Sequence, residues 1–240
     1  MELLWDGLRE GFRLLFTGNR EVIEITIRSL LISGSAILIA LTIGALAGYF
    51  LATQRFWGRN FVLSLVNTGM GLPPVVVGLF VAIMLWRSGP LGLLNLLYTP
   101  GAMVVAQAML ATPIVTGFTV ASIQSLHPKL RLQIMALGAS RWQTIWLLLR
   151  EARLPLLAGV MAGFGAAISE VGASLMVGGN LKDTRVLTTA TVLEVQKGNF
   201  EMAIALSVVL LILIYAVNLV LTYVQQRERP PRLARGRFMP

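Results

Sequence analysis

The chain has 240 residues, of which 56% are hydrophobic and only 13% are charged. Soluble domains carry about a quarter charged residues, so this composition excludes an ordinary soluble domain and predicts an integral membrane protein. The absence of cysteine excludes disulfides, thiolate metal sites and a cysteine nucleophile. The formal net charge of +9 does not indicate nucleic acid, because in a membrane protein the location of charges matters more than their sum.

In chain order, residues 1–24 form an N-terminal segment that mixes acids and arginines with large apolar side chains. The pattern is typical of an amphipathic helix at the outer membrane interface, and equally of a short helix packed over a bundle. Residues 25–224 form the transmembrane domain. Residues 225–240 are a basic, proline-broken tail, for which we expect contact with anionic lipid headgroups.

Five apolar runs are long enough to cross a hydrocarbon core of roughly 30 Å at about 1.5 Å per residue. Their periodicity is not the alternation of barrel strands, so we expect an all-α membrane protein with five transmembrane helices. The runs cover residues 30–53, 62–86, 102–123, 154–177 and 202–224. Lys and Arg in the flanks number twelve on the side of the C-terminus and eight on the other side. This excess predicts a cytoplasmic C-terminus and an N-terminus outside.

The loop between the third and fourth runs has strong local signals. Pro128 suits the first turn of a helix, Gly138 can end that helix in the left-handed conformation, and Ser140 and Gln143 have capping-box spacing for a second helix. The second helix is amphipathic, with apolar residues at helical spacing. They are Trp142, Ile145, Trp146 and Leu149. A plain connecting hairpin of helices would have the same pattern.

The stretch MALGASRW (135–142), followed by Leu154 and Pro155, resembles the glycine-centred cytoplasmic loop of ABC importer permeases. The resemblance implies a type I ABC importer permease-like fold, with a coupling helix in the loop at about 125–153 that seats in a groove of the ATPase. The family's usual Glu-Ala-Ala is absent here, and the Leu-Pro pair lies roughly one helical turn late. By position, the ATPase-coupling residues are Ala136, Leu137, Gly138, Ala139 and Ser140.

Three further stretches are similar to molybdate- and tungstate-type permeases. They are GLPPVVVGL (71–79), AQAMLATPIV (106–115), and ISEVGASLMVGGN (168–180) with DTRVLTTA (183–190). The last resembles tungstate importer permeases most closely. The resemblance implies an ABC importer permease that moves an oxyanion, tungstate first, with molybdate or another oxyanion as the alternative. A non-ABC channel or secondary carrier is the second alternative.

The same resemblance implies the partners and the location. They are a second copy of the chain, separate ABC ATPase subunits that hold ATP and Mg, an extracytoplasmic oxyanion-binding protein, and the lipid of a prokaryotic cytoplasmic membrane. The chain has no G-x-x-x-x-G-K-[ST] phosphate loop, so we expect it to bind no cofactor or metal and to have no enzymatic activity of its own. A serine hydrolase is disfavoured, because GASR and GASL lack a second glycine and His127 lies far from Ser174 in the expected topology.

Glu170 is an acid within the fourth run, about 10 Å inside its outer end by helical rise. Acids at this depth are costly and rarely face lipid, and its neighbours on a helical face are small. An ionised carboxylate would repel an oxyanion, so we expect Glu170 to have a structural or gating role rather than to contact the ion. Its expected hydrogen-bond partners are Asn67, Thr68, Gln107, Thr112 and Asn218.

Polar and small residues of the second to fourth runs are the candidates for the translocation path or gate. They are Asn67, Thr68, Thr112, Thr116, Glu170 and Ser174. For any single one of these side chains, an ordinary interhelical hydrogen bond is the more common role. The outer loop that contains Lys182 and Arg185 is expected to dock the binding protein and attract an anion, or to be a solvated face.

Overall fold

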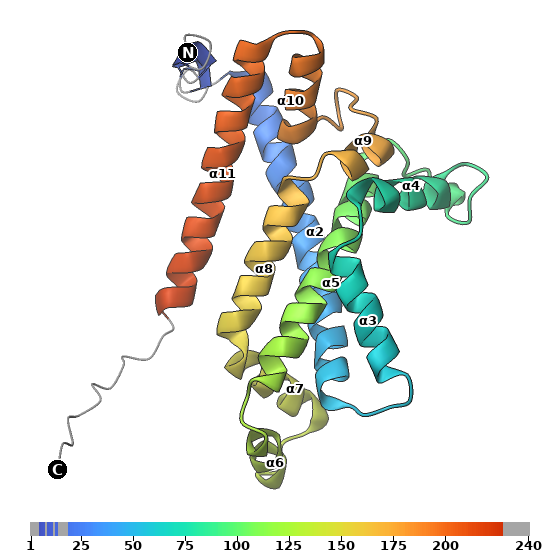
Figure 1. The fold of residues 1–240 in the computed structure, drawn as a ribbon, viewed down its shortest axis with the longest axis vertical. Helices are drawn as coiled ribbons and strands as arrows, with labels where there is room; N and C mark the ends of the chain where they lie inside the picture. The colour runs from blue at the N-terminus through green and yellow to red at the C-terminus, as the bar shows by residue number, and fades with distance from the viewer. Residues whose placement is uncertain (1–4, 8, 12, 14–18, 228–240) are drawn as a thin grey trace, which may run out of the picture.

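The computed structural model describes residues 5–7, 9–11, 13 and 19–227, and this part of the chain is helical, without strands. Three helices are long and apolar enough to cross a membrane: α2, α5 and α11 (Figure 1). They span Arg20–Thr53, Pro100–Gln124 and Phe200–Arg227. Local signals account for the starts of the first two, because side-chain oxygens of Asn19 and Thr99 accept hydrogen bonds from first-turn amides.

The second and fourth spans are each broken into two helices. α3 (Arg59–Met70) and α4 (Pro74–Leu85) differ in direction by 104°, and α8 (Arg153–Ile168) and α9 (Gly172–Gly178) by 58°. Pro73 and Pro74 lack the amide donors that a continuous helix needs, so the first break lies there. The chain therefore has five spans if each bent pair counts as one. The expected spans over 62–86 and 154–177 are thus each formed by a bent pair of helices.

Shorter helices connect the spans. α6 (Lys129–Ala136) and α7 (Arg141–Glu151) form the loop between α5 and α8. α10 (Leu187–Gln196) packs beside α11 at the opposite end of the molecule, where we expected only a loop (Figure 1). A single 3₁₀ turn, η1 (Gly92–Leu94), follows α4.

Glycines allow close packing of α2 and α8 on α5, the central helix. A Cβ on Gly48 of α2 would lie 2.5 Å from Cβ of Thr119, and a Cβ on Gly159 of α8 would lie 2.5 Å from Cβ of Phe118. Real Cβ atoms do not approach this closely, so a larger residue at either position would separate the helices. The small-residue spacing therefore serves packing within one chain.

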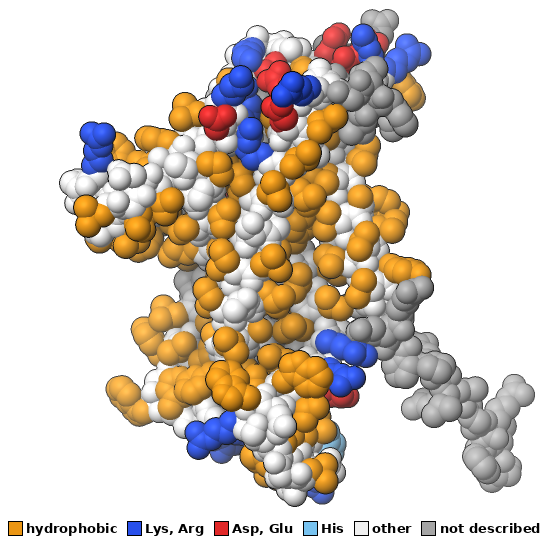
Figure 2. Space-filling view, turned by 180° about the vertical axis from the view of Figure 1, so that it is seen from behind, with side chains coloured by type: hydrophobic (Ala, Val, Ile, Leu, Met, Phe, Trp, Pro, Cys, Tyr) orange, Lys and Arg blue, Asp and Glu red, His pale blue; other side chains and the backbone are white. Residues whose placement is uncertain are grey.

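The distribution of side chains over the surface is that of a membrane protein. Hydrophobic side chains cover the middle of the molecule, and Lys and Arg gather towards its two ends (Figure 2). Large apolar side chains stay exposed along the helices, among them Leu38 on α2 and Phe80 on α4. The prediction of an all-α membrane protein is confirmed.

The N-terminal segment is described only in part. Gly7 and Gly11 are helical, and they lie against Ile204 and Ala205 near the start of α11. These contacts agree with a helix packed over the bundle, whereas the interfacial alternative stays a prediction. The remaining residues of 1–18, and the basic tail beyond Arg227, lie outside the described residues.

Candidate coupling surface and translocation site

The breaks of the two bent spans lie against each other. A Cβ on Gly172, at the start of α9, would lie 2.6 Å from Cγ2 of Val75 in the first turn of α4. A Cβ on Gly78 of α4 would lie 2.5 Å from Cα of Ala173. α4 and α9 therefore pack closely against each other at one end of α5, and glycine is required at both contacts (Figure 1).

Glu170 lies in the break of the fourth span and is 7% exposed. Its Oε1 accepts a hydrogen bond of 2.7 Å from the backbone N–H of Ala173, and its carbonyl oxygen accepts one of 3.1 Å from the Thr188 hydroxyl. The carboxylate thus accepts from an amide in the first turn of α9, where such an amide has no intrahelical partner. Because the helix ends before Glu170, the side chain turns back onto its own chain. Its hydrogen bonds therefore do not go to the partners that we expected, namely Asn67, Thr68, Gln107, Thr112 and Asn218.

Gln107 of α5 instead connects α2 with α9. Its Oε1 accepts a hydrogen bond of 3.0 Å from Ser33, and its Nε2 donates one of 3.4 Å to the hydroxyl of Ser174. All three side chains are buried, so this polar group fixes three helices relative to one another. The sequence reasoning missed Ser33. Its position one turn after Ser29, on the same face of α2, is the signal that points to it.

The other candidate path residues separate into two groups. Thr116 and Ser174 are buried, and Thr112 is half-buried with its hydroxyl bonded to the carbonyl oxygen of Ala108. Asn67 and Thr68 are exposed on α3, a helix that buries none of its residues within this chain. The structure therefore does not bring the six candidates into one lining. Their role in the path stays a prediction.

The coupling loop has the local structure that the sequence predicts. Gly138 has a φ of +82° between α6 and α7, and Ser140 and Gln143 form both bonds of a capping box at the start of α7. Leu137 is 87% exposed and Trp142 is 73% exposed. Ala136 and Ser140 are also exposed, and Ala139 is half-buried. Exposed apolar surface of this kind is typical of protein-interaction and membrane-interaction sites, and the role of the elbow in ATPase coupling stays a prediction.

A buried cluster attaches the loop to the bundle. Leu148 and Ala152 pack with Tyr49 of α2 and Ile123 of α5. These four side chains join the loop to two spanning helices.

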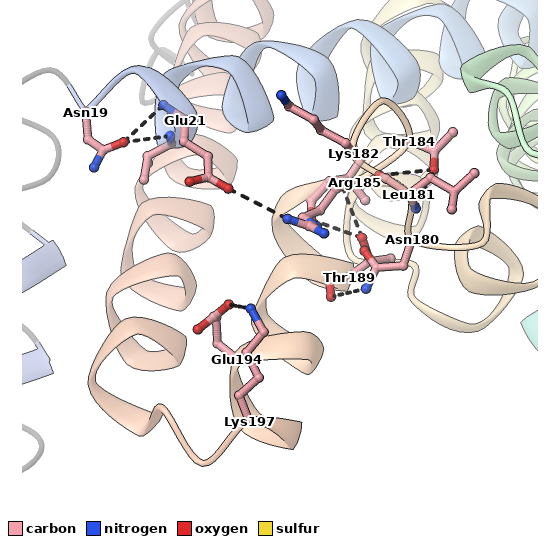
Figure 3. A network of polar contacts seen from close by, with 12 residues as sticks. Asn19, Glu21, Asn180, Leu181, Lys182, Thr184, Arg185, Thr189, Glu194 and Lys197 are labelled. Atoms are coloured by element: carbon pink, nitrogen blue, oxygen red, sulfur yellow. Dashed lines mark hydrogen bonds and ion pairs between the residues drawn. The ribbon is translucent and has the colours of Figure 1, made fainter.

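The opposite end of the molecule carries a charged surface. Arg28 of α2 donates hydrogen bonds to the carbonyl oxygens of Lys182 and Arg185. The side chain of Arg185 lies 3.7 Å from that of Glu21 (Figure 3). These residues line part of a pocket of about 610 Å³. Lys182 is exposed, whereas Arg185 is half-buried and tied to its neighbours. The loop before α10 is thus held to the start of α2.

The structure also locates the groups considered for enzymatic or metal chemistry. His127 is exposed at the start of the coupling loop, and its Nδ1 accepts a hydrogen bond from the backbone N–H of Lys129. Ser174 is buried beside Gln107. Within residues 19–227 and the described part of the N-terminal segment, no three His, Asp or Glu side chains gather to hold a metal ion.

Known proteins show the same architecture. Residues 40–230 match the family described as "binding-protein-dependent transport system inner membrane component", and the chain belongs to that family. A crystal structure of a bacterial ABC transporter that imports alginate has a TM-score of 0.72, with 20% identity over 92% of this chain and 84% of that one. A second structure of the alginate transporter, in complex with a periplasmic protein that holds an alginate pentasaccharide, has a TM-score of 0.71. The type I ABC importer permease fold is therefore confirmed.

Two relatives are more similar in sequence. A probable anion ABC transporter permease of Haloferax volcanii is 40% identical over 90% of this chain and 95% of that protein. The tungstate uptake system permease TupB of Peptoclostridium acidaminophilum is 38% identical over 94% of this chain and 100% of that protein. The similarity thus extends over nearly the whole transmembrane domain in both cases.

Proposed function

We propose that the chain is the permease subunit of an ABC importer that carries tungstate across the cytoplasmic membrane. The observation that carries this proposal is the 38% identity with a tungstate uptake permease over that protein's full length. The 40% identity with a probable anion permease agrees with an oxyanion cargo. Molybdate, a tetrahedral dianion like tungstate, is the alternative cargo.

The energy for import comes from a separate ATPase that binds ATP and Mg. The elbow at Leu137 and Gly138 supports this division, because it offers exposed apolar surface at the tip of a loop packed on the bundle. In the proposal, ATP-driven closure of the ATPase pushes α6 and α7. The cluster around Leu148 passes the movement to α2 and α5.

Two copies of the chain enclose the path. α3 buries none of its residues within one copy, and it exposes Asn67 and Thr68 close to the break before α4. A tetrahedral dianion accepts hydrogen bonds from amide and hydroxyl groups and is repelled by carboxylates. Asn67 and Thr68 suit the lining of such a path. Glu170 is buried and bonded to Ala173, so its charge is directed away from the path.

The end that carries α10 faces outward in this proposal, and the coupling loop and the C-terminus face the cytoplasm. The excess of Lys and Arg on the side of the coupling loop supports this orientation. An extracytoplasmic binding protein then docks over α10 and the charged loop at Lys182. The alginate transporter provides a precedent, since its structure contains a bound periplasmic protein.

The test is elemental analysis of cells with and without the gene at trace oxyanion, with tungsten and molybdenum measured by mass spectrometry. Selective loss of cellular tungsten is the expected result. Loss of molybdenum alone would change the cargo and keep the mechanism. Unchanged levels of both metals, with ATPase and binding protein present, would overturn the oxyanion assignment.

A second measurement separates an ABC importer from a channel or a secondary carrier. The permease is reconstituted in proteoliposomes with and without the ATPase, and with binding protein and tungstate outside. Uptake that requires both the ATPase and ATP is expected. Uptake of the same rate without the ATPase would identify a carrier or a channel.

A further inference from the structure

A basic pocket of about 410 Å³ opens at the end of the molecule that carries the coupling loop. Its lining comes from the end of α2, the start of α3, the end of α5, and the loop helices α6 and α7. Arg55, Arg59 and Arg131 line it together with His127, and among the described residues no Asp or Glu does. The pocket thus combines three permanent positive charges without a carboxylate to neutralise them.

Two of these arginines are held in place by neutral acceptors. Nε of Arg59 donates a hydrogen bond of 2.7 Å to the carbonyl oxygen of Leu51, and a terminal nitrogen of Arg131 donates one of 2.9 Å to that of Thr53. Both acceptors lie in the last turn of α2. A guanidinium has five N–H donors, so these bonds leave most of each donor set free. Nε of Arg131 is buried without a hydrogen-bond partner within the described part of the chain.

We propose that this pocket binds a tetrahedral oxyanion, either a free ion such as tungstate or the phosphate group of an anionic lipid. Guanidinium groups bind such anions through paired, charge-assisted hydrogen bonds, and clustered arginines without an acid favour a dianion. The pocket lies where the spans end, which in the proposed orientation is the level of the cytoplasmic lipid headgroups. Its volume is within the range of small-molecule sites.

Occupancy of this pocket would connect the coupling loop to the bundle. Arg131 belongs to α6, whereas Arg55 lies in the turn between α2 and α3 and Arg59 is the first residue of α3. An anion that contacts all three draws α6 towards the end of α2. The loop is already joined to the bundle by the cluster around Leu148 and by the bond from Arg131 to Thr53, and anion binding adds a further attachment.

The test uses the full-length permease, purified in detergent and titrated with sodium tungstate in a calorimeter. Arg55→Gln is the principal variant, because Arg59 and Arg131 also bond to the last turn of α2 and their loss affects folding. Lys129→Gln is the matched control, since it also removes one positive charge at this end of the molecule, from α6, but outside the pocket lining. We expect Arg55→Gln to weaken tungstate binding about tenfold and Lys129→Gln to change it less than about twofold. Arg131→Gln, judged only if its melting temperature is unchanged, should repeat the tenfold loss.

Nanodiscs distinguish the two sources of the anion. Tungstate binding is compared in phosphatidylglycerol and in neutral phosphatidylcholine. If phosphatidylglycerol weakens tungstate binding to the wild type but not to Arg55→Gln, the lipid phosphate is the natural occupant of the pocket. If phosphatidylglycerol does not change tungstate binding, the free oxyanion is the natural occupant. Binding that is absent in the wild type, or equal in Arg55→Gln and the wild type, overturns the inference. Failure of this kind leaves ATP-driven import intact, so it is distinguishable from failure of the proposed function.

An acidic side chain of the ATPase is the rival occupant. It would appear as unchanged tungstate binding together with weaker co-purification of the ATPase in Arg55→Gln and Arg131→Gln. That result would also overturn the anion site.

Discussion

The carboxylate of Glu170 accepts a hydrogen bond of 2.7 Å from the backbone N–H of Ala173, so an acid within an apolar span caps the short helix that follows it. The bond exists because the fourth span breaks between Ile168 and Gly172, which exposes amides that a continuous helix would satisfy. The free-energy cost of a carboxylate at this depth is offset because the backbone amide of Ala173 and the positive end of α9 face the carboxylate.

Replacement of Glu170 should therefore show whether its side chain is needed as a hydrogen-bond acceptor or as a negative charge. Glu170→Gln keeps a carbonyl oxygen for the Ala173 amide and should be mild, whereas Glu170→Ala removes the cap and should destabilise the protein by about 0.5–2 kcal/mol. Thermal unfolding of the purified permease and tungstate uptake measure the difference. Glu151→Ala, at an exposed acid, is the control. Equal losses in the Gln and Ala variants would argue against the capping role.

Gln107 should be coupled energetically to Ser174. Gln107→Ala breaks both of its bonds and leaves buried hydroxyls at Ser33 and Ser174, so we expect a lower unfolding temperature. In a double-mutant cycle with Ser174→Ala, the coupling should be about 0.6 kcal/mol, the average for membrane helices. Thr42→Ala, at an exposed hydroxyl bonded within its own helix, should have little effect. Additive losses would mean that the Gln107–Ser174 bond contributes nothing.

Two glycines of α2 provide a matched test of helix packing. Gly48→Ala places a methyl group 2.5 Å from Cβ of Thr119 and should destabilise the protein by about 1–3 kcal/mol. Gly34→Ala meets nothing within 4 Å and should be neutral or slightly stabilising, because alanine is the better helix former. Thermal unfolding in detergent compares them. Similar unfolding temperatures for the two variants would contradict the close packing of α2 on α5.

The elbow should govern assembly with the ATPase. Leu137→Asp puts a charge on an apolar contact surface and should weaken co-purification of the ATPase by at least about tenfold. Leu93→Asp, at a side chain that is 95% exposed in η1, should leave assembly unchanged. Tungstate-stimulated ATP hydrolysis by the complex should fall in parallel with co-purification. Normal assembly of Leu137→Asp would place the ATPase contact elsewhere.

A negative charge on the exposed face of α3 should slow the uptake of an anionic cargo. Asn67→Asp introduces an anion into the proposed path and should slow tungstate uptake by about tenfold, because like charges repel in a confined site. Asn60→Asp makes the same change at an exposed position near the start of α3, and uptake should stay close to normal. The measurement is initial uptake in proteoliposomes of equal protein content. Equal rates for both variants would remove Asn67 from the path.

Much of the fold was predictable from the sequence because its signals are local. Runs of apolar residues indicated the spans, since each must cross the same hydrocarbon thickness. The coupling loop was predicted in detail, because Gly138 and the Ser140–Gln143 pair act over a few residues, and the structure has both features. α10 was missed because its sequence, LTTATVLEVQ, has weak helical signals. The helix packs mainly against α11, and this contact cannot be read from the local sequence.

The candidate site depended on tertiary structure. The sequence alone determined that an acid lies in an apolar span and that polar residues interrupt the helices around it. Only the folded chain decided that the break at Glu170 meets the start of α4, that Gln107 bonds Ser33 rather than Glu170, and that Arg131 joins Arg55 in one pocket. The physical reason is that these contacts join residues far apart in the chain. Hydrophobic spacing and capping signals describe only neighbours within a few turns.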